Sequence, residues 1–244
     1  MTPETWGWLA AILLFAYFIR GITGFGSGLI AVPLLAHFLP LQFVVPFILV
    51  TDFAASVTLA GAGRKHIAWG ELKPLLPASA VGVLAGVFLL IQLPRESLLL
   101  GLGVFVMIFG LRNLLNLHGE KPISRWWAVP AGLTGGTVGA LFGTGGPPYV
   151  IYLSHRLKDK TLLRGTFSGL FILDGGFRIL AFLATGLLLQ QGMFTALLVG
   201  LPLMAAGLYL GHRVHLGISN PQMLRLIGIL LLLSGASLVW RAAT

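Results

Sequence analysis

The sequence predicts an all-α polytopic membrane protein made of two inverted repeats, each a broken, re-entrant helical hairpin followed by three transmembrane helices. Composition is the first observation, because 57% of the 244 residues are hydrophobic and 9% are charged, whereas a soluble domain carries roughly 25% charged residues. Apolar runs of about 20 residues recur, as helical spans require, and the alternating pattern of a β-barrel is missing. The third observation is a pair of glycine-rich stretches at corresponding places in the two halves.

Polar residues divide the chain into eight apolar regions. They cover residues 6–38, 41–62, 72–93, 96–117, 126–154, 162–189, 193–216 and 221–242. Six of them have the length of an ordinary span. The first and the fifth are too long for one span and too short for two, and both contain a glycine-rich stretch. We therefore expect each of these two regions to form a broken hairpin.

The glycine-rich stretches contain the residues least suited to a continuous helix. The first is Gly21-Ile22-Thr23-Gly24-Phe25-Gly26-Ser27-Gly28, with Pro33 after it, and the second is Gly132-Leu133-Thr134-Gly135-Gly136-Thr137-Val138-Gly139, with Gly143-Thr144-Gly145-Gly146-Pro147-Pro148 after it. Glycine weakens a helix by roughly 1 kcal/mol and proline by roughly 3 kcal/mol. In lipid, a broken helix survives only where protein or a wet cavity surrounds it. Paired interruptions of this kind indicate the binding site of a transporter.

The two halves also share spaced residues outside these stretches. Pro77, Gly82, Gly86, Gly103 and Gly110 recur 125 residues later as Pro202, Gly207, Gly211, Gly228 and Gly235. The offset shrinks towards the start of each half, since Asp52 matches Asp174 and Gly21 matches Gly132. This change predicts an insertion in the second half, at residues 143–148. We expect one integral membrane domain with a first repeat at residues 1–120 and a second at residues 121–244.

Loop charge predicts the orientation of the halves. If regions one and five each crossed once, the basic loops at 63–73 and 156–164 would lie on opposite sides, against the positive-inside rule. If both regions fold back, the loops at 63–73, 117–125, 156–164 and 212–220 share the cytoplasmic side. Each repeat then crosses an odd number of times, so the repeats are inverted and both termini lie outside. The excess of 16 Lys and Arg over 7 Asp and Glu therefore indicates membrane orientation and not nucleic-acid binding.

Charged residues at bilayer depth are costly and mark functional sites. Asp52 and Asp174 lie inside apolar regions, and Arg178 follows Asp174 by one helical turn, so both lie on one helix face. Arg178 and Asp174 form either a structural ion pair or a site in which the arginine binds an oxyanion in bidentate fashion. Ser56 takes the place of Arg178 in the first half. Either aspartate is a candidate for proton coupling.

The breaks themselves offer main-chain donors for an anion. A helix that starts inside the membrane presents N–H groups and the positive end of its dipole. The candidate ligands are Gly24, Gly26, Ser27, Thr144, Gly145 and Gly146. The alternative is close helix packing, which we prefer for Gly82, Gly86, Gly207 and Gly211. Arg20, just before the first stretch, either snorkels to the interface or faces a cavity.

Other chemistry finds little support in the sequence. The chain has no cysteine and no HExxH motif, so we expect no disulfide, metal or cofactor. A hydrolase would need a histidine paired with Ser27, and His37 has no acid beside it. A dinucleotide fold would need a strand before the glycines. We therefore do not expect an enzyme.

The glycine stretches, the segment from Gly143 to Pro148, and the segment from Asp174 to Arg178 together resemble the sulfite exporter TauE/SafE family, which is also named for toluene-sulfonate uptake. The resemblance covers residues 8 to 240. It implies a multi-pass permease of the bacterial inner membrane that moves small anions such as sulfur oxyanions, organosulfonates or short organic acids.

The sequence therefore predicts a secondary transporter that binds a small anion at a midplane site and works by alternating access. Two alternatives stay open: an anion channel of the same fold, and a non-transporting assembly or sensor subunit whose glycines serve only packing. A homodimer is also open. Because the second half contains both Arg178 and the extra glycines, we expect the anion nearer the second break than the first.

Overall fold

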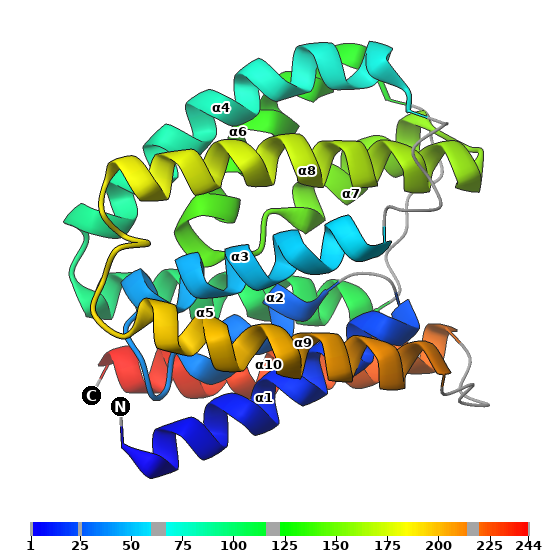
Figure 1. The fold of residues 1–244 in the computed structure, drawn as a ribbon. Helices are drawn as coiled ribbons and strands as arrows, with labels where there is room; N and C mark the ends of the chain where they lie inside the picture. The colour runs from blue at the N-terminus through cyan, green and yellow to red at the C-terminus, as the bar shows by residue number, and fades with distance from the viewer. Residues whose placement is uncertain (1, 24–25, 60–66, 116–122, 214–219, 244) are drawn as a thin grey trace. The chain divides into compact units, whose positions relative to one another are not determined.

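The computed structural model describes residues 2–23, 26–59, 67–115, 123–213 and 220–243, and these residues form helices and no strand. The elements, labelled in Figure 1 where there is room, are α1 (Pro3–Thr23), α2 (Ser27–Leu35), α3 (Leu41–Leu59), α4 (Trp69–Gln92), α5 (Arg95–Leu114), the short 3₁₀ helix η2 (Arg125–Trp127), α6 (Ala128–Phe142), α7 (Gly146–Arg156), α8 (Lys160–Ala184), α9 (Met193–Arg213) and α10 (Asn220–Ala243). The predicted all-helical fold is confirmed.

The helices group into two compact units that do not coincide with the halves of the sequence. Unit 1 comprises Met1–Val44, Gln92–His118 and Gln191–Thr244, and unit 2 comprises Val45–Ile91 and Gly119–Gln190. Both units therefore take helices from each half of the chain. The division into repeats at residue 120 stays a prediction.

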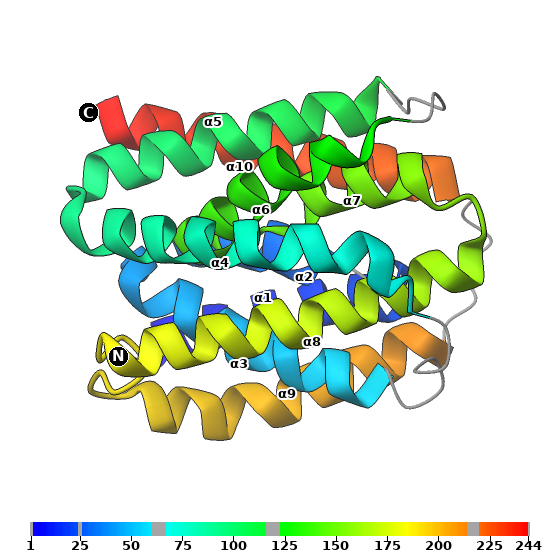
Figure 2. The same cartoon turned by 90° about the horizontal axis from the view of Figure 1, so that it is seen from above.

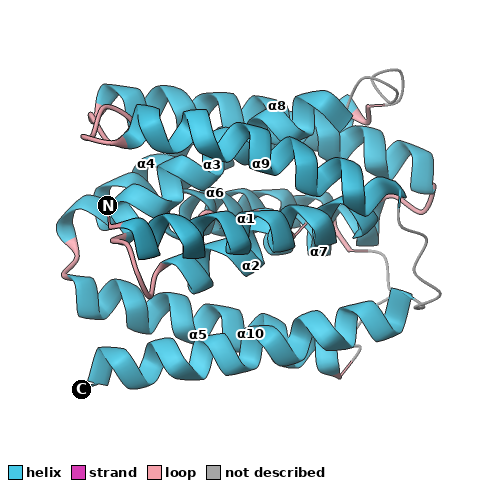
Figure 3. Ribbon diagram, turned by 60° about the horizontal axis from the view of Figure 1, so that its bottom comes forward, coloured by secondary structure: helices cyan, strands magenta, loops and turns pink. Residues whose placement is uncertain are grey.

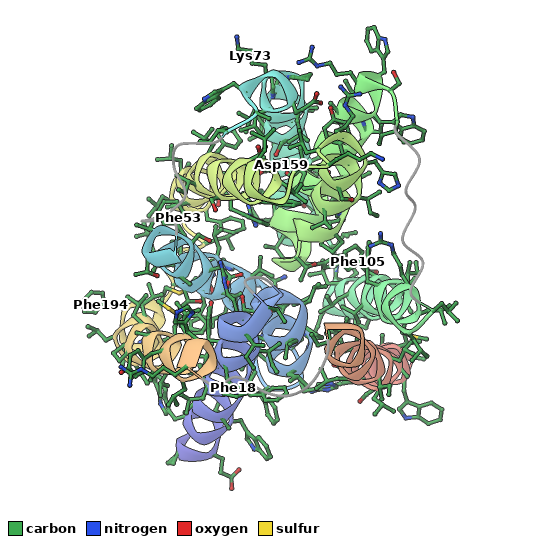
Figure 4. The ribbon with its side chains drawn as sticks, turned by 90° about the vertical axis from the view of Figure 1, so that its right-hand side faces the viewer. Phe18, Phe53, Lys73, Phe105, Asp159 and Phe194 are labelled. Atoms are coloured by element: carbon green, nitrogen blue, oxygen red, sulfur yellow. The ribbon has the colours of Figure 1, made fainter. Side chains whose placement is uncertain are left out.

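Within the described residues, five helices are long and apolar enough to cross a membrane, namely α1, α3, α4, α8 and α9. A shorter apolar stretch lies in α10, at Ile227–Ala243. Large apolar side chains on these helices are exposed, as expected of a surface that faces lipid. Phe194 of α9 is 74% exposed and points away from its helix in Figure 4.

In unit 1, α5 and α10 form a tightly packed antiparallel pair (Figures 2 and 3). A Cβ atom built on Gly103 would lie 2.9 Å from the carbonyl oxygen of Gly235, and one built on Gly110 would lie 2.9 Å from that of Gly228. Gly228 and Gly235 follow Gly103 and Gly110 by 125 residues each (228 − 103 = 125; 235 − 110 = 125). The two helices therefore present the same patch to each other, as across a two-fold axis.

A second glycine contact occurs once in each unit. In unit 1 α9 packs on α1, and in unit 2 α4 packs on α6; each pair is parallel. The matching contacts are Gly207 with Leu14 and Phe18, and Gly82 with Leu133 and Thr137. In both cases the missing side chain lets the backbones meet, as small residues do in membrane proteins. The packing role expected for these glycines agrees with the contacts.

These contacts change how the two halves align. In the contact of unit 2, Leu133 and Thr137 of α6 take the places that Leu14 and Phe18 of α1 have in unit 1. The equivalent residues are therefore 119 positions apart (133 − 14; 137 − 18). The pairing of Gly21 with Gly132, which has an offset of 111, is therefore wrong. At the observed offset Gly26 corresponds to Gly145, and both residues cap the second helix of a break. The segment at 143–148 is then the counterpart of the first motif, not an insertion.

Both broken regions fold back to where they start. In unit 1 the ring of Trp8, in α1, stacks on that of Phe38, after α2, with centroids 5.5 Å apart. In unit 2 Nη1 of Arg156, the last residue of α7, donates to the carbonyl oxygen of Ile123, just before η2, at 3.0 Å. Single crossings of regions one and five are therefore excluded.

Candidate functional site

The break between α6 and α7 is built from glycines that serve different purposes. Gly143 ends α6 with φ of 68°, a left-handed conformation that favours glycine. Gly145 caps α7, and a Cβ atom there would lie 2.5 Å from the carbonyl oxygen of Gly135 and 2.9 Å from Cα of Gly139. Gly143 therefore permits the turn, and Gly145 permits the turn to lie against α6.

A buried charge pair from α8 lies beside this break. Nε of Arg178 is 2.9 Å from Oδ2 of Asp174, one turn earlier on the helix, and the two residues are 6% and 2% exposed. Nη1 of Arg178 donates to the carbonyl oxygen of Gly139 at 3.0 Å. Arg178 thus joins α8 to the last turn of α6.

Two hydroxyl groups complete the surroundings of Asp174. Oδ1 accepts from Ser79 Oγ at 2.5 Å and from the Tyr149 hydroxyl at 3.0 Å. The two hydroxyl oxygens are themselves 2.7 Å apart. The ring of Tyr149 lies directly over Gly135, so a side chain at Gly135 would displace it.

Sequence reasoning missed Ser79 and Tyr149. Tyr149 follows the second motif immediately, after Pro148, and that position could have indicated a role. Ser79 gives no such signal, because Asp174 is 95 residues away in the chain.

Thr144 presents a buried hydroxyl at the start of α7. The residue is 4% exposed, and its Oγ1 has no hydrogen-bond partner among the described residues. Thr51, inside α3, and Thr185, directly after α8, satisfy this group with a carbonyl oxygen four residues earlier. A polar group buried without a partner costs roughly 1–3 kcal/mol, so it calls for a ligand or a water molecule.

The start of α7 and the guanidinium group of Arg178 are neighbours. A Cβ atom on Gly139 would lie 3.2 Å from Nη1 of Arg178 and 3.3 Å from Cα of Gly145. No side chain caps α7, and Pro147 lacks an N–H group, so the first-turn donors are few. The charge of Arg178 and the positive end of α7 therefore lie close together, and Thr144 directly precedes the residue that caps this helix; such an arrangement suits an anion.

Unit 1 contains a related arrangement at the break between α1 and α2. Gly26 caps α2 with φ of 95°, and Ser27 begins the helix. Nη1 of Arg20 donates to Ser27 Oγ at 3.0 Å, and its guanidinium lies 6.0 Å from the centre of the Tyr17 ring. Arg20 is 7% exposed, so it does not snorkel to the interface.

The predicted ligands therefore fall into two groups. Thr144, Gly145, Gly146, Asp174 and Arg178 meet at the α6–α7 break in unit 2. Gly26 and Ser27 lie in unit 1 with Arg20, and Gly24 lies outside the described residues. The remaining candidate, Asp52, is half-buried on α3, where Ser56 Oγ donates to its main-chain oxygen at 2.8 Å.

A second charged cluster in unit 2 was not expected from the sequence. Glu71, at the start of α4, pairs with Arg156 of α7, with Oε1 and Nη2 2.8 Å apart, and also accepts from the hydroxyl of Tyr152. Tyr152 is also part of a buried core of side chains from α4, α6, α7 and α8. The charged cluster ties the returning end of α7 to α4.

No group of His, Asp and Glu that could hold a metal ion occurs in the described parts of the chain.

The sequence is similar to known membrane proteins over most of its length. The family model for the sulfite exporter TauE/SafE matches residues 9–238. The "Probable inner membrane transporter protein TsaS" of Comamonas testosteroni is 31% identical over 202 residues, which cover 80% of this chain and 83% of that protein. No solved structure matches. The chain therefore belongs to the sulfite exporter TauE/SafE family and is a multi-pass inner-membrane transporter, not an enzyme.

Proposed function

We propose that the chain is a secondary transporter that binds a small oxyanion at the α6–α7 break of unit 2. The observation that carries this proposal is the buried Thr144 hydroxyl without a hydrogen-bond partner, beside an uncapped helix start and Arg178. Transporters that bind substrates at interrupted helices use the same combination of helix dipole and main-chain donors.

The donor set favours an anion with several oxygen atoms on one centre. Arg178 offers a planar fork that matches two oxygens, Thr144 offers a hydroxyl, and Gly146 offers an N–H group at the start of α7. A sulfite, a sulfonate or a carboxylate group has this pattern of acceptors. The family description and the relationship to an inner-membrane transporter support the sulfur-containing members of this class.

Asp174 provides a route to proton coupling. In the structure its charge is balanced by Arg178. When an anion takes up the charge of Arg178, Asp174 keeps its two hydroxyl donors but loses its counter-ion, and a buried charge without a partner is costly. We therefore infer that one proton enters with the anion.

Many transporters that work by alternating access are built from two related halves, and several contacts support inverted repeats here. A two-fold axis that relates antiparallel helices is perpendicular to them, so for α5 and α10 in a bilayer it lies in the membrane plane. Such an axis inverts one half relative to the other. The antiparallel direction also agrees with region five folding back, because one extra crossing would make α5 and α10 parallel.

The ligand assignment is tested with Thr144→Val, which removes the hydroxyl and keeps the shape, and Thr144→Ser, which retains the hydroxyl. Uptake of sulfite, toluene-sulfonate and acetate is measured in proteoliposomes. We expect the valine variant to lose affinity by about tenfold, as one hydrogen bond to an anion implies, and the serine variant to stay near the wild type. Equal affinities in all three proteins would contradict the assignment.

Substitution of Arg178 alone leaves the buried carboxylate of Asp174 without a counter-ion, so a loss of activity could come from misfolding as well as from lost anion binding. The double variant Asp174→Asn, Arg178→Gln keeps the site neutral. We expect it to fold, to bind no anion and to move no protons. A current far above carrier turnover in the wild type would instead identify a channel, and flux of none of the three anions would favour a non-transporting subunit.

A further inference from the structure

A groove on unit 1 has features that the transport site does not explain. It lies between α2 and α10 and has a volume of about 420 Å³, within the roughly 300–1,000 Å³ of ligand sites. Its lining residues are Leu34, His37, Ile229, Leu230, Leu233, Ser234 and Ser237. Most of this surface is apolar, with two serines along one side.

Ser234 is the first sign of a ligand. It is 7% exposed, and its Oγ has no hydrogen-bond partner among the described residues, although it faces the groove. Helical hydroxyls elsewhere, such as Thr134 and Ser56, donate to a carbonyl oxygen four residues earlier. Ser234 departs from this pattern, although most residues that line the groove with it are apolar.

A positive charge lies at one end of the groove. Arg241 is one turn beyond Ser237 on α10, and its Nη1 donates to the carbonyl oxygen of His37 at 2.5 Å. This contact uses one of the five N–H donors of the guanidinium. Trp240, beside it, is 74% exposed, as is typical of aromatic residues at the membrane interface.

The dimensions match one leaflet of a bilayer. From Arg241 back to Ile229 α10 rises about 18 Å, at 1.5 Å per residue, and half of the hydrocarbon core is about 15 Å. Ser237 lies about 6 Å below Arg241, between the charged end and the apolar part. Charge, hydroxyl groups and apolar wall therefore follow each other in the order of a phosphate, glycerol esters and an acyl chain.

We propose that this groove is a binding site for one anionic glycerophospholipid, with its phosphate on Arg241, its ester oxygens at Ser237 and Ser234, and one acyl chain along Leu233 and Leu230. Basic side chains such as Arg241 are attracted to anionic lipids, which supports the choice of an anionic headgroup. The site is separate from the α6–α7 break and does not depend on which anion is transported.

The test measures thermal stability in detergent while phosphatidylglycerol is added, with phosphatidylcholine of the same acyl chains and glycerol 3-phosphate as comparison ligands. We expect a saturable rise in melting temperature with phosphatidylglycerol only. Arg241→Gln should weaken the response about tenfold, since a charge-assisted hydrogen bond is lost. Arg213→Gln is the matched control, because Arg213 also lies in the last turn of a helix of unit 1 but packs over Tyr209.

A second pair of variants tests the apolar part. Leu233 is 70% exposed, so Leu233→Trp fills the groove without entering the core, and we expect it to abolish the response. Leu198→Trp, at a 58% exposed position on α9, should respond as the wild type does. Equal responses to both phospholipids, a full response of Arg241→Gln, or a response to glycerol 3-phosphate alone would overturn the proposal. So would efficient disulfide cross-linking of Leu233→Cys in membranes, because a second copy would then occupy the groove.

Discussion

Gly145 and Gly146 are adjacent, yet the structure predicts opposite responses to alanine. At Gly145 the new Cβ atom would lie 2.5 Å from the Gly135 carbonyl oxygen, whereas ordinary contacts begin near 3.4 Å, so the break must move by about 0.9 Å (3.4 − 2.5). The neighbouring atoms are backbone, and the hydrogen bond from Arg178 holds α6 at Gly139, so the steric clash can be relieved only by moving the backbone. Overpacking of this kind costs about 1–3 kcal/mol, and we expect the upper end of that range. At Gly146 the nearest atom is Cζ of Phe171 at 3.7 Å, which is an ordinary contact.

Unfolding of the two variants in detergent, followed by anion uptake in proteoliposomes, measures both effects. We expect Gly145→Ala to unfold at a lower temperature and to transport poorly, because the start of α7 moves relative to Arg178. Gly146→Ala should unfold within about 0.5 kcal/mol of the wild type. If Gly145→Ala is as stable and as active as Gly146→Ala, the close approach of the break to α6 is not what positions the site.

Three further predictions concern other parts of the chain. Glu71→Gln should destabilise unit 2 by about 1–3 kcal/mol, because Arg156 at the end of α7 loses its partly buried counter-charge. Chemical denaturation measures the change, and a variant as stable as the wild type would show that the Glu71–Arg156 pair does not stabilise the fold. Since the chain has no cysteine, Ser124→Cys and Gln191→Cys can be labelled one at a time with an impermeant thiol reagent in intact cells. Only Gln191→Cys should react, because the loop at Ser124 is predicted to be cytoplasmic and the turn at Gln191 to be outside; the reverse pattern would mean that the predicted orientation is inverted. Burial, followed by the charge of Arg241, lowers the pKa of His37, so the unfolded state binds the proton more tightly and the folded state loses stability as the pH falls below about 6.5; the melting temperatures of the wild type and His37→Gln should therefore differ little near neutral pH and separate in acid, where only the wild type is destabilised by this group.

The positions of the helices were predictable because they follow from local rules. Apolar length and glycine content identified both breaks, and loop charge required both regions to fold back, as the contacts of Trp8 with Phe38 and of Arg156 with Ile123 show. These signals act within a few residues, so the sequence displays them directly. The predicted termini outside and basic loops inside remain open to the labelling experiment.

The alignment of the halves was not predictable from glycine spacing alone. Gly132 and Gly136 contact α4 at Leu75 and Ser79, whereas Gly21 contacts α9 at Leu208 and Gly211. The glycines of the two motifs therefore serve the corresponding pair of helices but meet it at different levels, which composition alone does not reveal. Ser79 illustrates the same limit at the site, because its partnership with Asp174 depends on how α4 and α8 meet in space. Long-range pairs of this kind leave no periodic signal in one sequence.

The corrected alignment explains why the two breaks carry their arginines on different helices. Arg20 corresponds to Gly139 (20 + 119 = 139), and Ser56 corresponds to Arg178 (56 + 122 = 178). In the first half the arginine therefore projects from the helix before the break, to Ser27. In the second half that position is a glycine, and its missing side chain leaves the space in which Arg178 donates to the Gly139 carbonyl oxygen. A side chain at Gly139 would meet the guanidinium at 3.2 Å, so glycine at 139 and arginine at 178 are parts of one arrangement. Each break thus keeps a buried guanidinium although a different helix supplies it, as expected if the fold requires the charge at this place and not a particular helix to carry it.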